Sequence, residues 1–110
     1  MSELQRIDIH GAQTLIDNGA HIVDIRQHSD YIAGHIRGAR HLDNHSLGEF
    51  INAVDYDEPV IVCCYHGISS LSAGNYLISQ GYTNVFSLDG GFEGWRTAGC
   101  DSIRTDSSEN

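Results

Sequence analysis

The chain has 110 residues, of which 40% are hydrophobic, so it is long enough to bury one core of ordinary size. The formal net charge of −9, with 15 acidic residues against 6 arginines, argues against nucleic-acid partners, and the lack of lysine excludes P-loop and Schiff-base lysines. No apolar run approaches the roughly 20 residues of a membrane span, and the first residues show no signal-peptide pattern.

The first half of the chain predicts short strands and helices in alternation. Its apolar periodicity indicates strands over residues 4–8, 21–25 and 40–42, and helices over residues 10–18, 29–33 and 46–54. Asp8 is placed to cap the first helix, and Gly19 is placed to end it.

Three polar residues of this half have two interpretations each. Asp24 and Arg26 follow the second strand, and the simpler interpretation is a structural ion pair at the strand end. The alternative places Arg26 at the rim of an anion site. His35 lies in the loop over residues 34–39, where its ring nitrogens are expected to bind loop backbone, and the alternative is a catalytic role.

The second half is organised around residues 60–70. Residues 60–63 are β-formers that predict a buried strand, and the following pattern predicts a helix over residues 70–80. Cys64 begins the polar, glycine-containing turn between them. The free N–H groups of such a turn bind anions together with the positive end of the helix dipole, and they lower the pKa of a thiol. The sequence therefore predicts a nucleophilic Cys64 at an anion site.

Residues 84–88 predict a last strand, and residues 92–98 a last helix whose Phe92 and Trp95 fill the core. Apolar strands that alternate with helices indicate an α/β fold, with a mainly parallel sheet covered on both faces. Ligands of such folds bind at the carboxyl ends of strands, where Cys64 lies. We expect one domain over residues 1–100 and a polar, disordered tail over residues 101–110.

The three cysteines do not suggest a disulfide framework, and a reducing cytoplasm is the predicted location. Adjacent strand side chains point to opposite faces, so Cys63 is predicted to be a buried core thiol rather than a metal ligand beside Cys64 and His66. Cys100 is interpreted as incidental. We expect no metal site and no cofactor, because a structural zinc site needs a second ligand pair.

Four blocks of the chain resemble the single-domain rhodaneses, especially the thiosulfate sulfurtransferases of the GlpE type. The blocks are in the family's order, over residues 23–26, 34–39, 64–70 and 89–95. The resemblance implies a rhodanese-like, five-stranded, mainly parallel sheet between helices. It also implies that Cys64 is catalytic and that the rest of the loop binds the substrate, namely Tyr65, His66, Gly67, Ile68, Ser69 and Ser70. For His66, a solvated loop residue is the alternative interpretation.

The implied activity is that of a thiosulfate:cyanide sulfurtransferase. Its Cys64 thiolate takes the outer sulfur of thiosulfate, releases sulfite, and passes the sulfur to cyanide or to a dithiol such as a thioredoxin-like protein. One alternative is a rhodanese-like module that binds a partner without catalysis. The other is a cysteine-dependent phosphatase, whose loop is one residue longer and is closed by an arginine that grips the phosphoryl group. Here Ser70 takes the place of that arginine.

Overall fold

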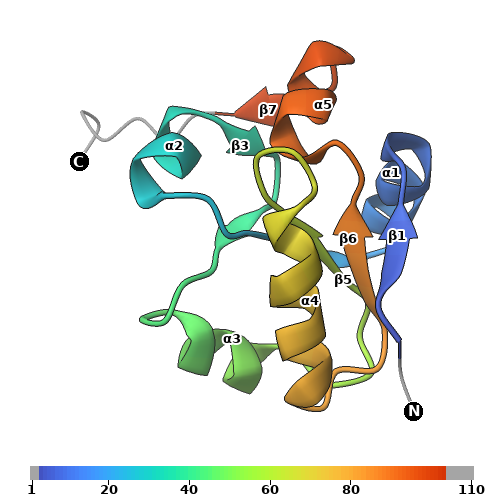
Figure 1. Cartoon of the computed structure of the whole chain (residues 1–110), viewed down its shortest axis with the longest axis vertical. Helices are drawn as coiled ribbons and strands as arrows, with labels where there is room; N and C mark the ends of the chain where they lie inside the picture. Colours follow the sequence, from blue (N-terminus) through green and yellow to red (C-terminus); the bar gives the residue numbers. More distant parts are fainter. Residues whose placement is uncertain (1–2, 104–110) are drawn as a thin grey trace.

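A computed structural model describes residues 3–103 of the chain. Its main feature is a five-stranded sheet in the order β1-β6-β5-β2-β4, in which every neighbouring pair is parallel (Figure 1). The strands of this sheet are β1 (Gln5–Ile7), β2 (His21–Asp24), β4 (Arg40–His41), β5 (Val60–Cys63) and β6 (Val85–Leu88). The helices are α1 (Ile9–Asp17), α2 (His28–Ala33), α3 (Leu47–Ala53), α4 (Ser69–Ser79) and α5 (Gly91–Thr97). The predicted α/β fold is confirmed.

Helices cover both faces of the sheet because successive strand side chains point into two different cores. In β5, Ile61 and Cys63 point into a core that includes residues of α1 and α5. Val60 and Val62 point into the opposite core, which includes residues of α3 and α4. In Figure 1, α4 lies on the viewer's side of the sheet. A short turn joins the carboxyl end of β5 to the start of this helix.

The ten elements predicted from periodicity are present, and each end lies within one residue of its predicted position. The predicted cap of the first helix is confirmed. Asp8 is its N-cap, with a side-chain oxygen that accepts a hydrogen bond from the Gly11 N–H at 2.8 Å. Among residues 3–103, no helix has the length and apolar composition needed to cross a membrane.

A second, two-stranded antiparallel sheet was not predicted. It pairs β3 (His35–Ile36), in the segment predicted to be a loop, with β7 (Ser102–Ile103), in the segment predicted to be a tail. Asp101, predicted to begin a disordered tail, instead accepts a hydrogen bond from Trp95 Nε1 on its backbone oxygen at 2.8 Å. That part of the tail prediction is wrong, because residues 101–103 continue the fold. The remaining tail, residues 104–110, lies outside the described residues.

Candidate active site

The turn between β5 and α4 wraps around the sulfur of Cys64, which is only 2% exposed. The N–H of Gly67 lies 3.1 Å from the sulfur, and the N–H of Ser70 lies 3.3 Å from it. The Ser70 hydroxyl is a third partner at 3.3 Å. Because α4 begins beside this turn, the positive end of its dipole also lies near the sulfur. The predicted turn between strand and helix is therefore present, and two of its N–H groups point at the Cys64 sulfur.

The pKa of Cys64 lies below its ordinary value although the side chain is buried. Burial is the largest single influence and acts to raise the pKa. It is outweighed by the hydrogen bond of the Ser70 hydroxyl together with those of the Ser70, Gly67 and His66 N–H groups. All four of these donors are uncharged, so neutral dipoles rather than a cation favour the thiolate.

The neighbouring Cys63 has the opposite environment. Its side chain is 0% exposed and packs in the core on the α1 and α5 side. Burial, followed by the nearby Asp24 carboxylate, raises the pKa of Cys63 far above its ordinary value. The prediction of a buried core thiol is confirmed. All three cysteines of the chain are free thiols.

The first turn of α5 holds the start of the sulfur-binding turn in place. The N–H of Phe92 donates to the carbonyl of Cys64 at 2.8 Å, and the N–H of Glu93 donates to the carbonyl of Tyr65 at 3.1 Å. Gly91 permits this approach, because a Cβ there would lie 2.5 Å from the Cys64 oxygen and its φ is +59°. Gly91, in the family-like block 89–95, therefore allows the first turn of α5 to approach the Cys64 and Tyr65 carbonyls.

Arg26 and Asp24 form the predicted ion pair at the end of β2, with Nη2 of Arg26 2.8 Å from a carboxylate oxygen. Arg26 also donates to the Gly34 carbonyl at 2.5 Å, and its guanidinium carbon lies 4.1 Å from the centre of the Phe92 ring. The guanidinium is buried among these partners. His35 Nδ1 lies 2.8 Å from the Tyr31 carbonyl, so the predicted contact with backbone is also present.

The other predicted loop residues lie around the sulfur rather than against it. The Tyr65 hydroxyl donates to the carboxylate of Asp30 in α2, so the Tyr65 side chain links the turn to α2. That hydrogen bond is the main reason why the pKa of Tyr65 is raised. Ile68 is 74% exposed, and Ser69 is also exposed.

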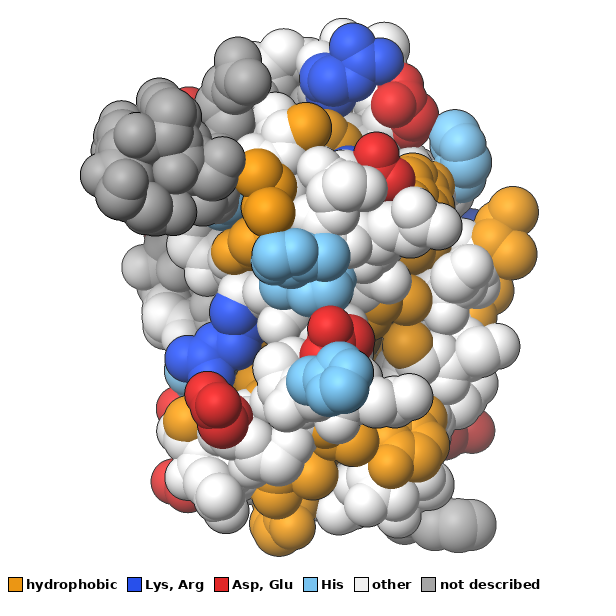
Figure 2. Space-filling view, turned by 90° about the vertical axis from the view of Figure 1, so that its left-hand side faces the viewer, with side chains coloured by type: hydrophobic (Ala, Val, Ile, Leu, Met, Phe, Trp, Pro, Cys, Tyr) orange, Lys and Arg blue, Asp and Glu red, His pale blue; other side chains and the backbone are white. Residues whose placement is uncertain are grey.

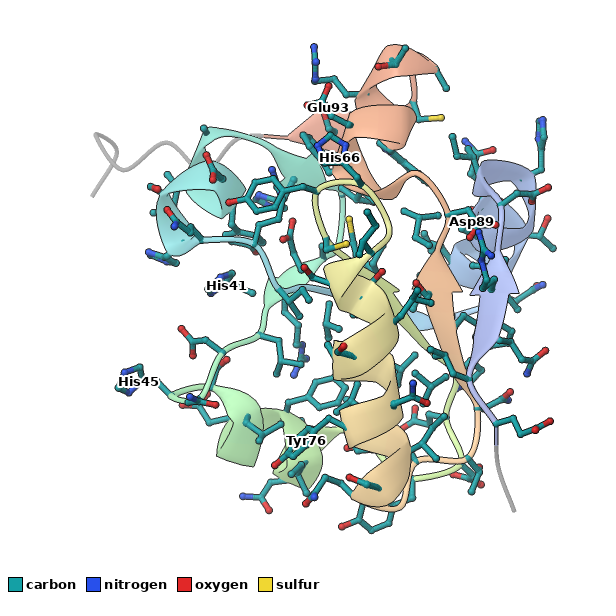
Figure 3. The ribbon with its side chains drawn as sticks, in the orientation of Figure 1. His41, His45, His66, Tyr76, Asp89 and Glu93 are labelled. Carbon is teal, nitrogen blue, oxygen red and sulfur yellow. The ribbon has the colours of Figure 1, made fainter. Side chains whose placement is uncertain are left out.

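His66 lies beside Glu93 above the turn (Figure 3). The proximity contributes to the lowered pKa of Glu93, whose main cause is the hydrogen bond from Arg96. On the face seen in Figure 2, acidic, basic and histidine side chains are interspersed rather than gathered into one basic patch.

One polar residue of the site was missed by the sequence reasoning. Ser87 lies in β6 with 0% exposure, and its Oγ is 2.6 Å from the Oγ of Ser70. The available signal was a single hydroxyl within an otherwise apolar strand, Val-Phe-Ser-Leu. Among residues 3–103, no three His, Cys, Asp or Glu side chains are grouped closely enough to hold a metal ion.

Comparison with known sequences gives one family. The model of the rhodanese-like domain matches residues 9–98. A protein named thiosulfate sulfurtransferase GlpE, from Pseudomonas fluorescens (strain SBW25), is 59% identical over 97 residues, which are 88% of this chain and 89% of the relative. A protein of the same name from Ectopseudomonas mendocina is 58% identical over 96 residues, which are 87% of this chain and 88% of the relative.

Solved structures share the fold. The solution NMR structure of the rhodanese-like domain of the Alr3790 protein from Anabaena sp. superposes with a TM-score of 0.80 at 25% identity, covering 93% of this chain and 81% of that one. The crystal structure of a rhodanese-related protein from Thermoplasma volcanium gives a TM-score of 0.76 at 22% identity, covering 93% and 99%. These likenesses agree with the parallel five-stranded sheet described above.

Proposed function

The chain belongs to the rhodanese-like domain family, and on that premise we propose that it carries sulfane sulfur as a persulfide on Cys64. The chain is a thiosulfate sulfurtransferase, as the names and identities of its relatives indicate. The observation that supports Cys64 as the carrier is the convergence of the Gly67 and Ser70 N–H groups on a sulfur whose pKa is lowered. The Ser70 hydroxyl, 3.3 Å from the sulfur, adds a third donor when Cys64 is a thiolate.

In the first half-reaction, the Cys64 thiolate attacks the outer sulfur of thiosulfate. A new S–S bond forms, the S–S bond of thiosulfate breaks, and its electron pair leaves with sulfite. The negative charge of the enzyme then resides on the terminal sulfur of the persulfide. The Gly67 and Ser70 N–H groups contact Sγ in the free enzyme, and we propose that N–H groups of the turn also stabilise the charge on the terminal sulfur.

In the second half-reaction, an acceptor attacks the terminal sulfur and the Cys64 thiolate leaves. With cyanide the product is thiocyanate. With a dithiol, the two thiols become a disulfide and the sulfur leaves as hydrogen sulfide. We propose cyanide or a dithiol, such as a thioredoxin-like protein, as the acceptor. We also propose the cytoplasm as the location, since free thiols suit a reducing compartment.

The remaining residues of the turn receive proposed roles from their positions. The Gly67 and Ser70 N–H groups bind the reacting sulfur. Tyr65, His66, Ile68 and Ser69 surround the approach to it and contact the donor or the acceptor. Arg26, which is paired with Asp24, supports the turn from the side of Phe92 and Tyr65.

The proposal is tested by the intact mass of the protein after brief exposure to thiosulfate. The wild type should gain one sulfur atom, and cyanide should remove it with formation of thiocyanate. Cys64→Ser should gain none and should lose sulfur transfer, because a serine hydroxyl has no comparable nucleophilicity toward sulfur. Cys100→Ser is the matched control and should behave as wild type.

A Cys64→Ser variant that still turns over thiosulfate would contradict the proposed carrier. A wild-type protein that gains sulfur from no donor, yet binds a partner protein, would favour the binding-module alternative.

A further inference from the structure

Two buried hydroxyls form a chain that ends at the Cys64 sulfur, since Ser70 Oγ lies 3.3 Å from Sγ and contacts Ser87 in turn. Ser70 and Ser87 are both 0% exposed, and their oxygens are 2.6 Å apart. Ser70 comes from the first turn of α4, and Ser87 comes from the centre of β6, beside Val62 of β5. Ser87 points toward α4 because it shares a strand face with Val85, whose side chain lies in the core on that side.

Each hydroxyl has one proton to donate, so the direction of the two hydrogen bonds is coupled. When Cys64 is a thiolate, the Ser70 proton must point at the sulfur, and Ser87 must then donate to the Ser70 oxygen. In the reverse arrangement, Ser70 would donate to Ser87. The Ser87 proton would then be buried without an acceptor, since the only hydrogen-bond partner of Ser87 Oγ among residues 3–103 is Ser70.

We propose that Ser87 is a positioning residue that holds the Ser70 hydroxyl as a hydrogen-bond donor to the Cys64 sulfur. It never contacts the substrate and acts only through Ser70. Two O–H bonds that point the same way also polarise each other, so the donor that reaches the thiolate is stronger than an isolated serine.

The inference rests on the proposed function, since it concerns the thiolate that attacks thiosulfate and leaves again in the second half-reaction. When the sulfur is transferred, the charge moves from Sγ to the terminal sulfur. Ser70 therefore stabilises the free thiolate more than the persulfide. Loss of the Ser87 hydroxyl should lower the fraction of Cys64 that is ionised. It should also slow the second half-reaction, in which the Cys64 thiolate is the leaving group.

The test is the rate of iodoacetamide alkylation of Cys64 against pH in Ser87→Ala. The midpoint should move upward by roughly 0.5–1 unit, which is about a three- to tenfold slower reaction at pH values below the midpoint. Ser87→Thr retains a hydroxyl and should restore the midpoint at least in part. Val85→Ala, in the same buried strand face, is the packing control: it should lower stability without moving the midpoint.

A double-mutant cycle then separates action through Ser70 from a direct effect. In a Ser70→Ala background, Ser87→Ala should cause no further shift. An unchanged midpoint in the single variant, or an equal shift in both backgrounds, would overturn the inference. Neither result would touch the proposed function, because that depends on whether Cys64 gains sulfur from thiosulfate, which the mass of Ser87→Ala reports separately.

Discussion

Cys63 and Cys64 are adjacent and almost equally buried, at 0% and 2% exposure, yet their pKa values move in opposite directions. Burial acts on both thiols and opposes ionisation in both. The difference comes from hydrogen-bond donors: the Cys64 sulfur receives those of the turn, whereas Cys63 faces apolar side chains and the Asp24 carboxylate. Solvent exposure is therefore a poor guide to thiol reactivity here, and directed N–H groups are the better one.

One residue of chain separates the two environments. The carbonyl of Cys63 still belongs to the sheet, where it accepts from the Ile25 N–H at 2.9 Å. The carbonyl of Cys64 has left the sheet and instead accepts from the Phe92 N–H at the start of α5. Because the side-chain direction alternates along a strand, leaving the sheet one residue earlier would direct a different thiol into the turn.

Among the substitutions that test the comparison of Cys63 with Cys64, Gly91→Ala is expected to cause the largest loss of sulfur transfer. The added Cβ would lie 2.5 Å from the Cys64 oxygen and 2.6 Å from the Tyr65 oxygen, at a backbone angle that disfavours alanine. The head of the turn must shift, so we expect a cost of about 1–3 kcal/mol in unfolding free energy and loss of most sulfur transfer. Urea unfolding and thiocyanate formation measure the two effects.

Gly48→Ala is the control for Gly91→Ala. Gly48 lies in α3 with open space around its Cβ position, so alanine should leave activity intact and add up to about 1 kcal/mol of stability. Wild-type activity in Gly91→Ala would show that sulfur transfer does not need the close approach of α5 to the Cys64 carbonyl.

Truncating the other thiol should separate stability from reactivity. Cys63→Ala removes a sulfur from the core on the α1 and α5 side, and the loss of packing should cost about 1–2 kcal/mol in unfolding free energy. Sulfur transfer and the alkylation profile of Cys64 should stay close to those of wild type. A large fall in the transfer rate of folded Cys63→Ala would mean that the two thiols are functionally linked.

The parts of the site that lie on one continuous segment could be predicted from sequence, and the parts that depend on tertiary contacts could not. Cys64 was predicted because its strand, turn and helix are consecutive in the chain. Ser87 was missed because its role requires β6 to lie beside β5 and to face α4. The direction of the Tyr65 side chain was likewise unpredictable, since it depends on where α2 places Asp30.

The same limit applies to the fold. The alternation of apolar strand and helix patterns predicted the five-stranded sheet and its helices. The strands β3 and β7 form because two segments far apart in the sequence meet in space, which no local pattern shows. The ion pair of Asp24 and Arg26 is local in sequence, and it was predicted correctly.

The smallest effect on the Cys64 thiolate is expected from His66→Ala. The contribution of His66 to the lowered pKa of Cys64 is its backbone N–H, which alanine retains. The midpoint of the alkylation profile should therefore stay below the roughly 8.5 of an unperturbed thiol.

The imidazole itself should matter for capture of the anionic donor, and only at pH values low enough to protonate it. There we expect a loss of roughly two- to fivefold in kcat/KM for thiosulfate, the range of an exposed charge, because the neighbouring Glu93 carboxylate offsets part of the positive charge. Alkylation and steady-state rates between acidic and alkaline pH separate the two contributions. If His66→Ala returns the Cys64 midpoint to that of a free thiol, the imidazole is the activator, and the uncharged donors of the turn do not explain why Cys64 differs from Cys63.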